Sequence, residues 1–136
     1  MSASVIPIAD ALIAYYEGDY EGTLRLMAEA RSLGNNFPPF IHEIRAAIEL
    51  GRTDEALAML ERGERSIESA TKGDRFNRLP TYGVSYWRGR AHEAAGDSVA
   101  ALEAYRATLA LPGNAVREIV DMRDTPDRIA ALEAAE

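Results

Sequence analysis

The sequence contains no cysteine among its 136 residues. Disulfide bonds, thiolate metal sites and cysteine nucleophiles are therefore excluded. No apolar run approaches the roughly 20 residues that a membrane-spanning helix needs, and the opening segment MSASVIPIAD has no basic leader. We therefore expect a cytoplasmic protein with no signal peptide and no membrane partner.

Runs of valine, isoleucine and threonine, which are typical of strands, are also missing. Alanine, leucine, glutamate and arginine dominate instead, and this composition favours helices. The hydrophobic content of 47% and the charged content of 27% are typical of a soluble globular protein. The length suits a single domain that buries a core without disulfides. We therefore predict one all-α domain.

Basic residues are fewer than acidic ones, with 15 Lys and Arg against 22 Asp and Glu. The net charge of −7 and the pI near 4.9 argue against nucleic acid as a partner, because the phosphate backbone attracts basic surfaces.

Motifs for catalysis or metal binding are absent as well. The sequence has no glycine-rich phosphate loop, nucleophile elbow or Ser-His-Asp arrangement. His42 and His92 each precede a glutamate, but neither lies in an H-E-x-x-H motif and no third ligand is evident. Three aspartates lie three residues apart, at Asp121, Asp124 and Asp127, and could resemble a cation site. A simpler interpretation is that they are acidic residues at the start of a helix, where negative charge is favourable. We predict no enzyme, no metal and no cofactor.

The chain instead contains a turn that occurs three times, at Gly18-Asp19, Gly51-Arg52 and Gly96-Asp97. Each turn lies between two segments with the apolar spacing of a helix. Because glycine commonly ends a helix and a short polar residue starts the next, the pattern predicts three helical hairpins. The expected helices span residues 7–17, 20–33, 40–50, 53–71, 82–95 and 98–111, with a loop at 72–80 and two further helices at 115–122 and 126–135.

The segments GDYEGTLRLM, GRTDEALAML and GDSVAALEAY resemble the turn and second helix of the tetratricopeptide repeat family. Ala56 and Ala101 match its small packing position, and Leu60 and Tyr105 match its large one. The first two turn glycines are 33 residues apart, close to the period of about 34 residues in this family. The segments ARSLGNN, SATKGDRF and YWRGRAHEAAGD look more loosely like repeats of bacterial regulators.

This resemblance implies a right-handed superhelix of antiparallel helix pairs. The repeats would span residues 4–36, 37–71 and 81–114, with the loop at 72–80 inside the array. Capping helices at 115–136 would complete a single domain.

The resemblance also implies a concave groove lined by the first helix of each repeat. Fixed aromatic and guanidinium groups in such a groove suit a peptide or protein segment that carries a carboxylate. Some members of this family bind a C-terminal carboxylate through lysine and asparagine side chains on these helices. Gly83 and Trp87 occupy the corresponding positions in the third repeat of this chain, so we do not expect that specificity. The candidate partner-binding residues are Tyr15, Arg45, Glu49, Tyr86 and Arg90.

Basic residues gather between positions 72 and 90, where Asp74 is the one acid. This segment could form a basic edge that faces an acidic partner. Alternatively, it is a solvated loop whose arginines pair with acids of neighbouring helices. Besides Arg90, the basic residues of this segment are Lys72, Arg75, Arg78 and Arg88.

Two other functions remain open at this point. A three-repeat array exposes apolar ends, so the protein could be a scaffold that associates with itself as a homodimer. It could also be a small-molecule sensor of a bacterial regulator, with the ligand under the 72–80 loop near Arg75, Arg90 and His92.

Overall fold

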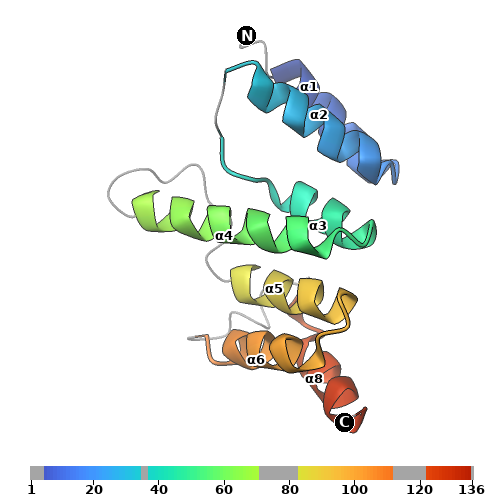
Figure 1. Ribbon diagram of the computed structural model, residues 1–136, viewed down its shortest axis with the longest axis vertical. Coiled ribbons are helices and arrows are strands. Elements are labelled where there is room, and N and C mark those ends of the chain that lie inside the picture. The colour runs from blue at the N-terminus through green and yellow to red at the C-terminus, as the bar shows by residue number, and fades with distance from the viewer. Residues whose placement is uncertain (1–4, 35–36, 71–82, 112–121, 136) are drawn as a thin grey trace. The chain divides into compact units, whose positions relative to one another are not determined.

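The computed structural model describes residues 5–34, 37–70, 83–111 and 122–135. Within these ranges every regular element is helical and no strand occurs, so the prediction of an all-α protein with helical hairpins is confirmed. The loop at 72–80 and nearly all of the helix predicted at 115–122 lie outside the described residues. The α-helices (Figure 1) are α1 Val5–Tyr16, α2 Tyr20–Ser32, α3 Ile41–Glu49, α4 Thr53–Ala70, α5 Gly83–Ala94, α6 Ser98–Leu109 and α8 Thr125–Ala134.

The chain divides into two compact units, Met1–Leu79 and Pro80–Glu136. Unit 1 contains α1 to α4, and unit 2 contains α5, α6 and α8. The single domain of three stacked repeats stays a prediction, and each unit is described by itself below.

All three turn glycines adopt a left-handed backbone, with φ of 82° at Gly18, 74° at Gly51 and 81° at Gly96. Glycine reaches this region without the steric penalty that a Cβ brings, and it therefore ends each first helix. The next helix is then capped in two of the three hairpins. Asp19 Oδ1 accepts from the Gly22 amide at 2.9 Å, and Asp97 Oδ1 accepts from the Ala100 amide at 3.1 Å.

The starts of α1, α3, α5 and α8 differ from the prediction by one or two residues. α1 begins at Val5, so Pro7 is its third residue rather than its first. Proline is tolerated there because the first four amides of a helix have no intrahelical acceptor. At α8 the capping residue is Asp124 rather than Thr125, and the Thr125 hydroxyl donates to the carbonyl of Met122 at 2.6 Å.

The hairpins of unit 1 pack in chain order. α1 lies on α2, α2 on α3, and α3 on α4, and the first helices α1 and α3 also touch. Small side chains let these helices approach closely. The most buried residues of this core are Ala11, Met27, Ala30, Ile44, Ala46, Ala47, Ala56 and Leu60, all with 0% exposure.

In unit 2, α5 packs on α6 and α6 packs on α8. The ring of Tyr105 on α6 lies directly against Gly89 on α5, where an added Cβ would be 2.5 Å from Tyr105 Cε1. The absence of a side chain at Gly89 is therefore what allows α5 and α6 to lie this close together.

Candidate functional site

Two predicted contact residues lie together in unit 1. Arg45 on α3 places its Cζ 5.8 Å from the ring centroid of Tyr15 on α1. Both side chains are half-buried, whereas Glu49, one turn further along α3, is exposed. A guanidinium at this distance is attracted to the negative face of the ring. The structure thus joins Tyr15 and Arg45 across two successive hairpins.

Other aromatic side chains surround this pair. The Tyr15 ring lies 5.2 Å from that of Tyr16, 5.8 Å from that of Tyr20 and 5.0 Å from that of His42, measured between centroids. The contacts with Tyr16 and His42 are edge-to-face, an arrangement that aromatic rings favour. We call Tyr15, Tyr16, Tyr20 and His42 the aromatic cluster. Of these four residues, Tyr15 alone was predicted from the sequence to contact a partner.

His42 is the titratable member of the aromatic cluster. Its Nε2 lies 3.4 Å from the Tyr16 hydroxyl, and its Nδ1 is buried with no hydrogen-bond partner among the described residues. Burial, followed by the charge of Arg45, lowers the pKa of His42, while Glu43 acts in the opposite direction. The ring is therefore neutral at pH 7, and Arg45 supplies the positive charge of this region.

Tyr86 was predicted to contact a partner, but the structure buries it completely, with 0% exposure. Its hydroxyl donates to Asp124 Oδ1 at 2.8 Å and accepts from Arg90 Nη1 at 3.0 Å. Arg90, the other predicted contact of this helix, lies over the rings of Tyr86 and Trp87, 5.8 and 5.4 Å from their centroids. Both residues therefore serve contacts inside unit 2.

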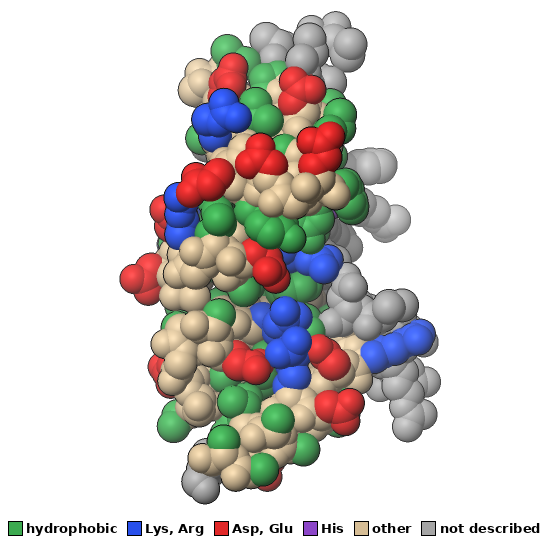
Figure 2. Space-filling model, turned by 90° about the vertical axis from the view of Figure 1, so that its right-hand side faces the viewer, with side chains coloured by type: hydrophobic (Ala, Val, Ile, Leu, Met, Phe, Trp, Pro, Cys, Tyr) green, Lys and Arg blue, Asp and Glu red, His purple; other side chains and the backbone are tan. Residues whose placement is uncertain are grey.

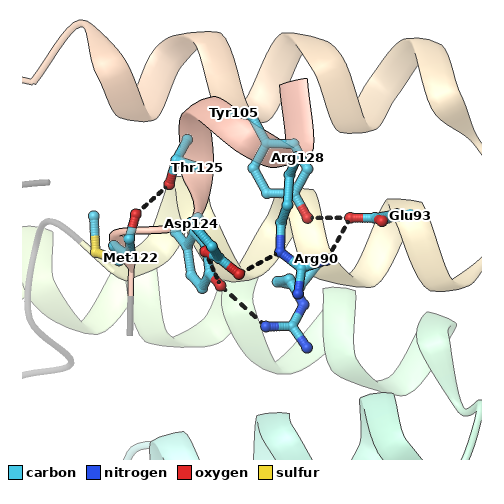
Figure 3. Close-up of polar contacts among 8 residues, drawn as sticks. Arg90, Glu93, Tyr105, Met122, Asp124, Thr125 and Arg128 are labelled. Carbon is cyan, nitrogen blue, oxygen red and sulfur yellow. Dashed lines mark hydrogen bonds and ion pairs between the residues drawn. The ribbon is translucent and has the colours of Figure 1, made fainter. Parts of the chain in front are cut away.

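These contacts belong to a larger group of polar side chains, shown in Figure 3. Arg128 on α8 donates from Nε to Asp124 Oδ2 at 2.6 Å and from Nη1 to Glu93 Oε1 at 3.0 Å. The same Glu93 oxygen accepts from the Tyr105 hydroxyl at 2.6 Å. We call this group the polar network, and its members are Tyr86, Arg90, Glu93, Tyr105, Asp124 and Arg128.

Within the polar network, the pKa values of Asp124, Tyr86 and Tyr105 depart from their ordinary values. Burial would raise the pKa of Asp124, but hydrogen bonds from Arg128 and Tyr86 outweigh it and hold that pKa below its usual value. Burial raises the pKa of Tyr86, and burial together with the Glu93 hydrogen bond raises the pKa of Tyr105. Ionised carboxylates thus accept from neutral phenols and from a charged guanidinium. Such charge-assisted bonds are strong, and they hold α8 against α5.

The predicted basic edge is only partly described. Lys72, Arg75 and Arg78 lie outside the described residues, whereas Arg88 on α5 is half-buried. On the face shown in Figure 2, acidic and basic side chains alternate, and hydrophobic side chains reach the surface between them. Described ion pairs on the surface include Arg65–Glu61 and Arg106–Glu133, each 3.5 Å long. The basic edge therefore stays a prediction.

Within the described part of the chain, no group of three or more His, Cys, Asp or Glu side chains could hold a metal ion. None of the described helices combines the length and the apolar composition that crossing a bilayer requires.

No protein-family model, no curated protein and no solved structure matches the chain. The helical hairpins and the side chains that they bring together are therefore the observations from which a function can be inferred.

Proposed function

We propose that this protein is a non-catalytic interaction module of the tetratricopeptide type, which binds a peptide or protein segment on the surface formed by its first helices. In this proposal the hairpins stack as a right-handed superhelix. Three left-handed glycine turns and the contact between the first helices α1 and α3 support it.

The observation that carries the proposal is the placement of Arg45 over Tyr15. The two residues come from different hairpins, and the Tyr15 ring is held by Tyr16, Tyr20 and His42. Because the ring is already ordered, a partner that docks here loses little of its binding energy to fixing side chains. The guanidinium carries five N–H donors in a planar fork that matches a carboxylate. The favoured partner therefore presents an acidic residue to Arg45.

Neighbouring side chains refine the chemistry of the partner. Tyr16 is 77% exposed beside Tyr15, and it offers an apolar ring to a hydrophobic residue of the segment. Glu49 is exposed one helical turn beyond Arg45, about 6 Å away between Cβ atoms. It favours a basic residue at that distance from the acid. We therefore propose a segment with an acidic, a hydrophobic and a basic residue close together.

The proposed contact surface excludes Tyr86 and Arg90. The Tyr86 hydroxyl is already bonded to Asp124 and Arg90, and its ring is buried. A partner would have to break these bonds before it could use either side chain. The surface is therefore restricted to Tyr15, Tyr16, Arg45 and Glu49 of unit 1.

Selection from a displayed library of random peptides tests the proposal. The wild-type chain should enrich peptides that contain an acidic residue, and Arg45→Glu should weaken their binding at least about tenfold, the loss expected for a charged hydrogen-bonded pair. Arg25→Glu is the matched control, because Arg25 is exposed on the second helix α2 and has the same charge. Retention of the same peptides by a folded Arg45→Glu variant would reject this surface.

A further inference from the structure

The outward face of α1 is apolar. Ala11 and Ala14 face the core of unit 1, with 0% and 7% exposure. On the opposite side Ala9 is exposed, Ile13 is 56% exposed and Tyr16 is 77% exposed. Since these three residues are four and three positions apart, they form one stripe along the helix, which we call the α1 stripe.

This face differs from the outward face of α4. Asp10 is the one charged residue within α1. On α4, by contrast, the exposed residues include Asp54, Glu55, Glu61 and Arg62. A surface helix normally turns charged residues to the solvent, and a helix that is apolar on both sides is normally covered on both sides. The α1 stripe therefore has the composition of an interface.

Acidic side chains line one edge of the α1 stripe. Asp10 and Glu17 are exposed, and neither forms an ion pair with a described residue. The Glu17 amide still donates to the carbonyl of Ile13, so the helical turn continues to Glu17 and the two acids lie two turns apart on the same side. The other edge is occupied by Tyr15, which contacts His42 of α3.

This arrangement disfavours a second copy of the chain as the occupant. In an antiparallel pair of α1 helices, the acidic edges meet, and Asp10 of one copy faces Glu17 of the other. In a parallel pair, the acidic edge of one copy must approach the edge that α3 already covers in the other. Like charges across an interface are unfavourable, whereas lysine or arginine at the same place would be attracted.

We propose that the α1 stripe binds an amphipathic helix of another protein, whose apolar stripe is bordered by lysine or arginine residues that pair with Asp10 and Glu17. The helix packs its apolar residues on Ile13 and Tyr16, in the manner of a helix laid on a hydrophobic surface. The α1 stripe shares Tyr16 with the surface proposed above, but it does not include Arg45, which belongs to α3.

The test uses two synthetic amphipathic helices of about four turns, which is long enough to cover the α1 stripe. They share a leucine stripe and differ only in flanking residues, lysine in one and glutamate in the other. In fluorescence anisotropy the wild-type chain should bind the lysine peptide at least about tenfold tighter, as two ion pairs beside an apolar contact predict. Asp10→Lys with Glu17→Lys should reverse this preference, and Ile13→Asp should abolish binding of both peptides.

A matched pair of substitutions separates this surface from a general attraction of cations to an acidic protein. Glu29 and Glu103 are exposed on α2 and α6, and changing both to lysine alters the net charge by the same amount. This variant should keep the preference for the lysine peptide. If it reverses the preference too, or if the wild-type chain binds both peptides equally or not at all, the proposal is wrong.

Self-association is the remaining outcome. A wild-type dimer in analytical ultracentrifugation that Ile13→Asp converts to a monomer would assign the stripe to a second copy and overturn the proposed occupant. Arg45→Glu should leave binding of the lysine peptide unchanged, so a failure of the α1 stripe can be told apart from a failure of the Arg45 surface.

Discussion

Arg31 and Glu43 join the two hairpins of unit 1 through a pair of hydrogen bonds, each 2.6 Å long, from the guanidinium to the carboxylate. The Glu43 side chain is 4% exposed and also accepts from the Phe40 amide at 2.9 Å. Arg31 in turn donates to the carbonyls of Phe37 and Pro38 at 3.3 Å. One ion pair thus ties the end of α2 to the start of α3.

Glu43→Ala should destabilise unit 1 by about 3 kcal/mol, because a partly buried guanidinium loses its carboxylate and the α3 start loses its cap. Urea denaturation followed by circular dichroism measures this change. Glu21→Ala is the control, since the Glu21–Arg52 pair is exposed and should be worth roughly 0–1 kcal/mol. Equal effects of the two substitutions would show that the Arg31–Glu43 pair does not hold the hairpins together.

Gly89→Ala should destabilise unit 2 by about 1–3 kcal/mol, because the new Cβ would lie 2.5 Å from the Tyr105 ring. The ring cannot move away easily, since its hydroxyl is bonded to Glu93 at 2.6 Å. Gly83→Ala on the same helix is the matched control, because its Cβ would meet Trp87 Cδ1 at 3.6 Å, an ordinary contact. The fluorescence of Trp87, the one tryptophan of the chain, reports unfolding of unit 2 in urea. A variant at Gly89 as stable as the wild type would contradict the close packing of α5 on α6.

Asp124→Asn should lower stability at pH 7 by about 1–3 kcal/mol, because Arg128 and Tyr86 lose a charged acceptor. The native pKa of Asp124 lies below its unfolded value of about 3.9. The stabilisation is therefore complete above that unfolded value, and it is lost as the pH falls through the native pKa. Urea midpoints between pH 7 and pH 2 should consequently decline less steeply for the variant than for the wild type. A variant with an unchanged acid profile would show that this carboxyl is not tied into the polar network.

His42→Phe should reduce the pH dependence of stability between neutral and mildly acidic conditions. The native pKa of His42 lies below the ordinary value of 6.5, so the unfolded chain binds a proton more readily than the folded one. The contribution of the neutral His42 ring to the free energy of unfolding is therefore fully present above pH 6.5. It decreases as the pH falls from 6.5 towards the native pKa of His42. Titration of the His42 ring protons by NMR measures the native pKa directly. A value at or above 6.5 would contradict burial of the ring beside Arg45.

Local sequence determined where the hairpins bend. Gly18, Gly51 and Gly96 could be identified because a left-handed residue after a helix favours glycine whatever surrounds it, and all three have positive φ. The presence of the helices and their approximate bounds follow in the same way from apolar spacing and from capping residues such as Asp19. These features depend on residues within about one helical turn of one another, so they can be predicted from the sequence alone.

Tertiary structure decided the long-range partners of the polar side chains. Tyr86 bonds with Asp124, which is 38 residues away, and Arg31 with Glu43, which is 12 away across a turn. Helical periodicity predicts which residues share one face of a helix, but it does not predict which other helix covers that face. For this reason Tyr86 was expected at a surface and is buried within unit 2, while Tyr15 and Arg45 meet because α1 and α3 pack together.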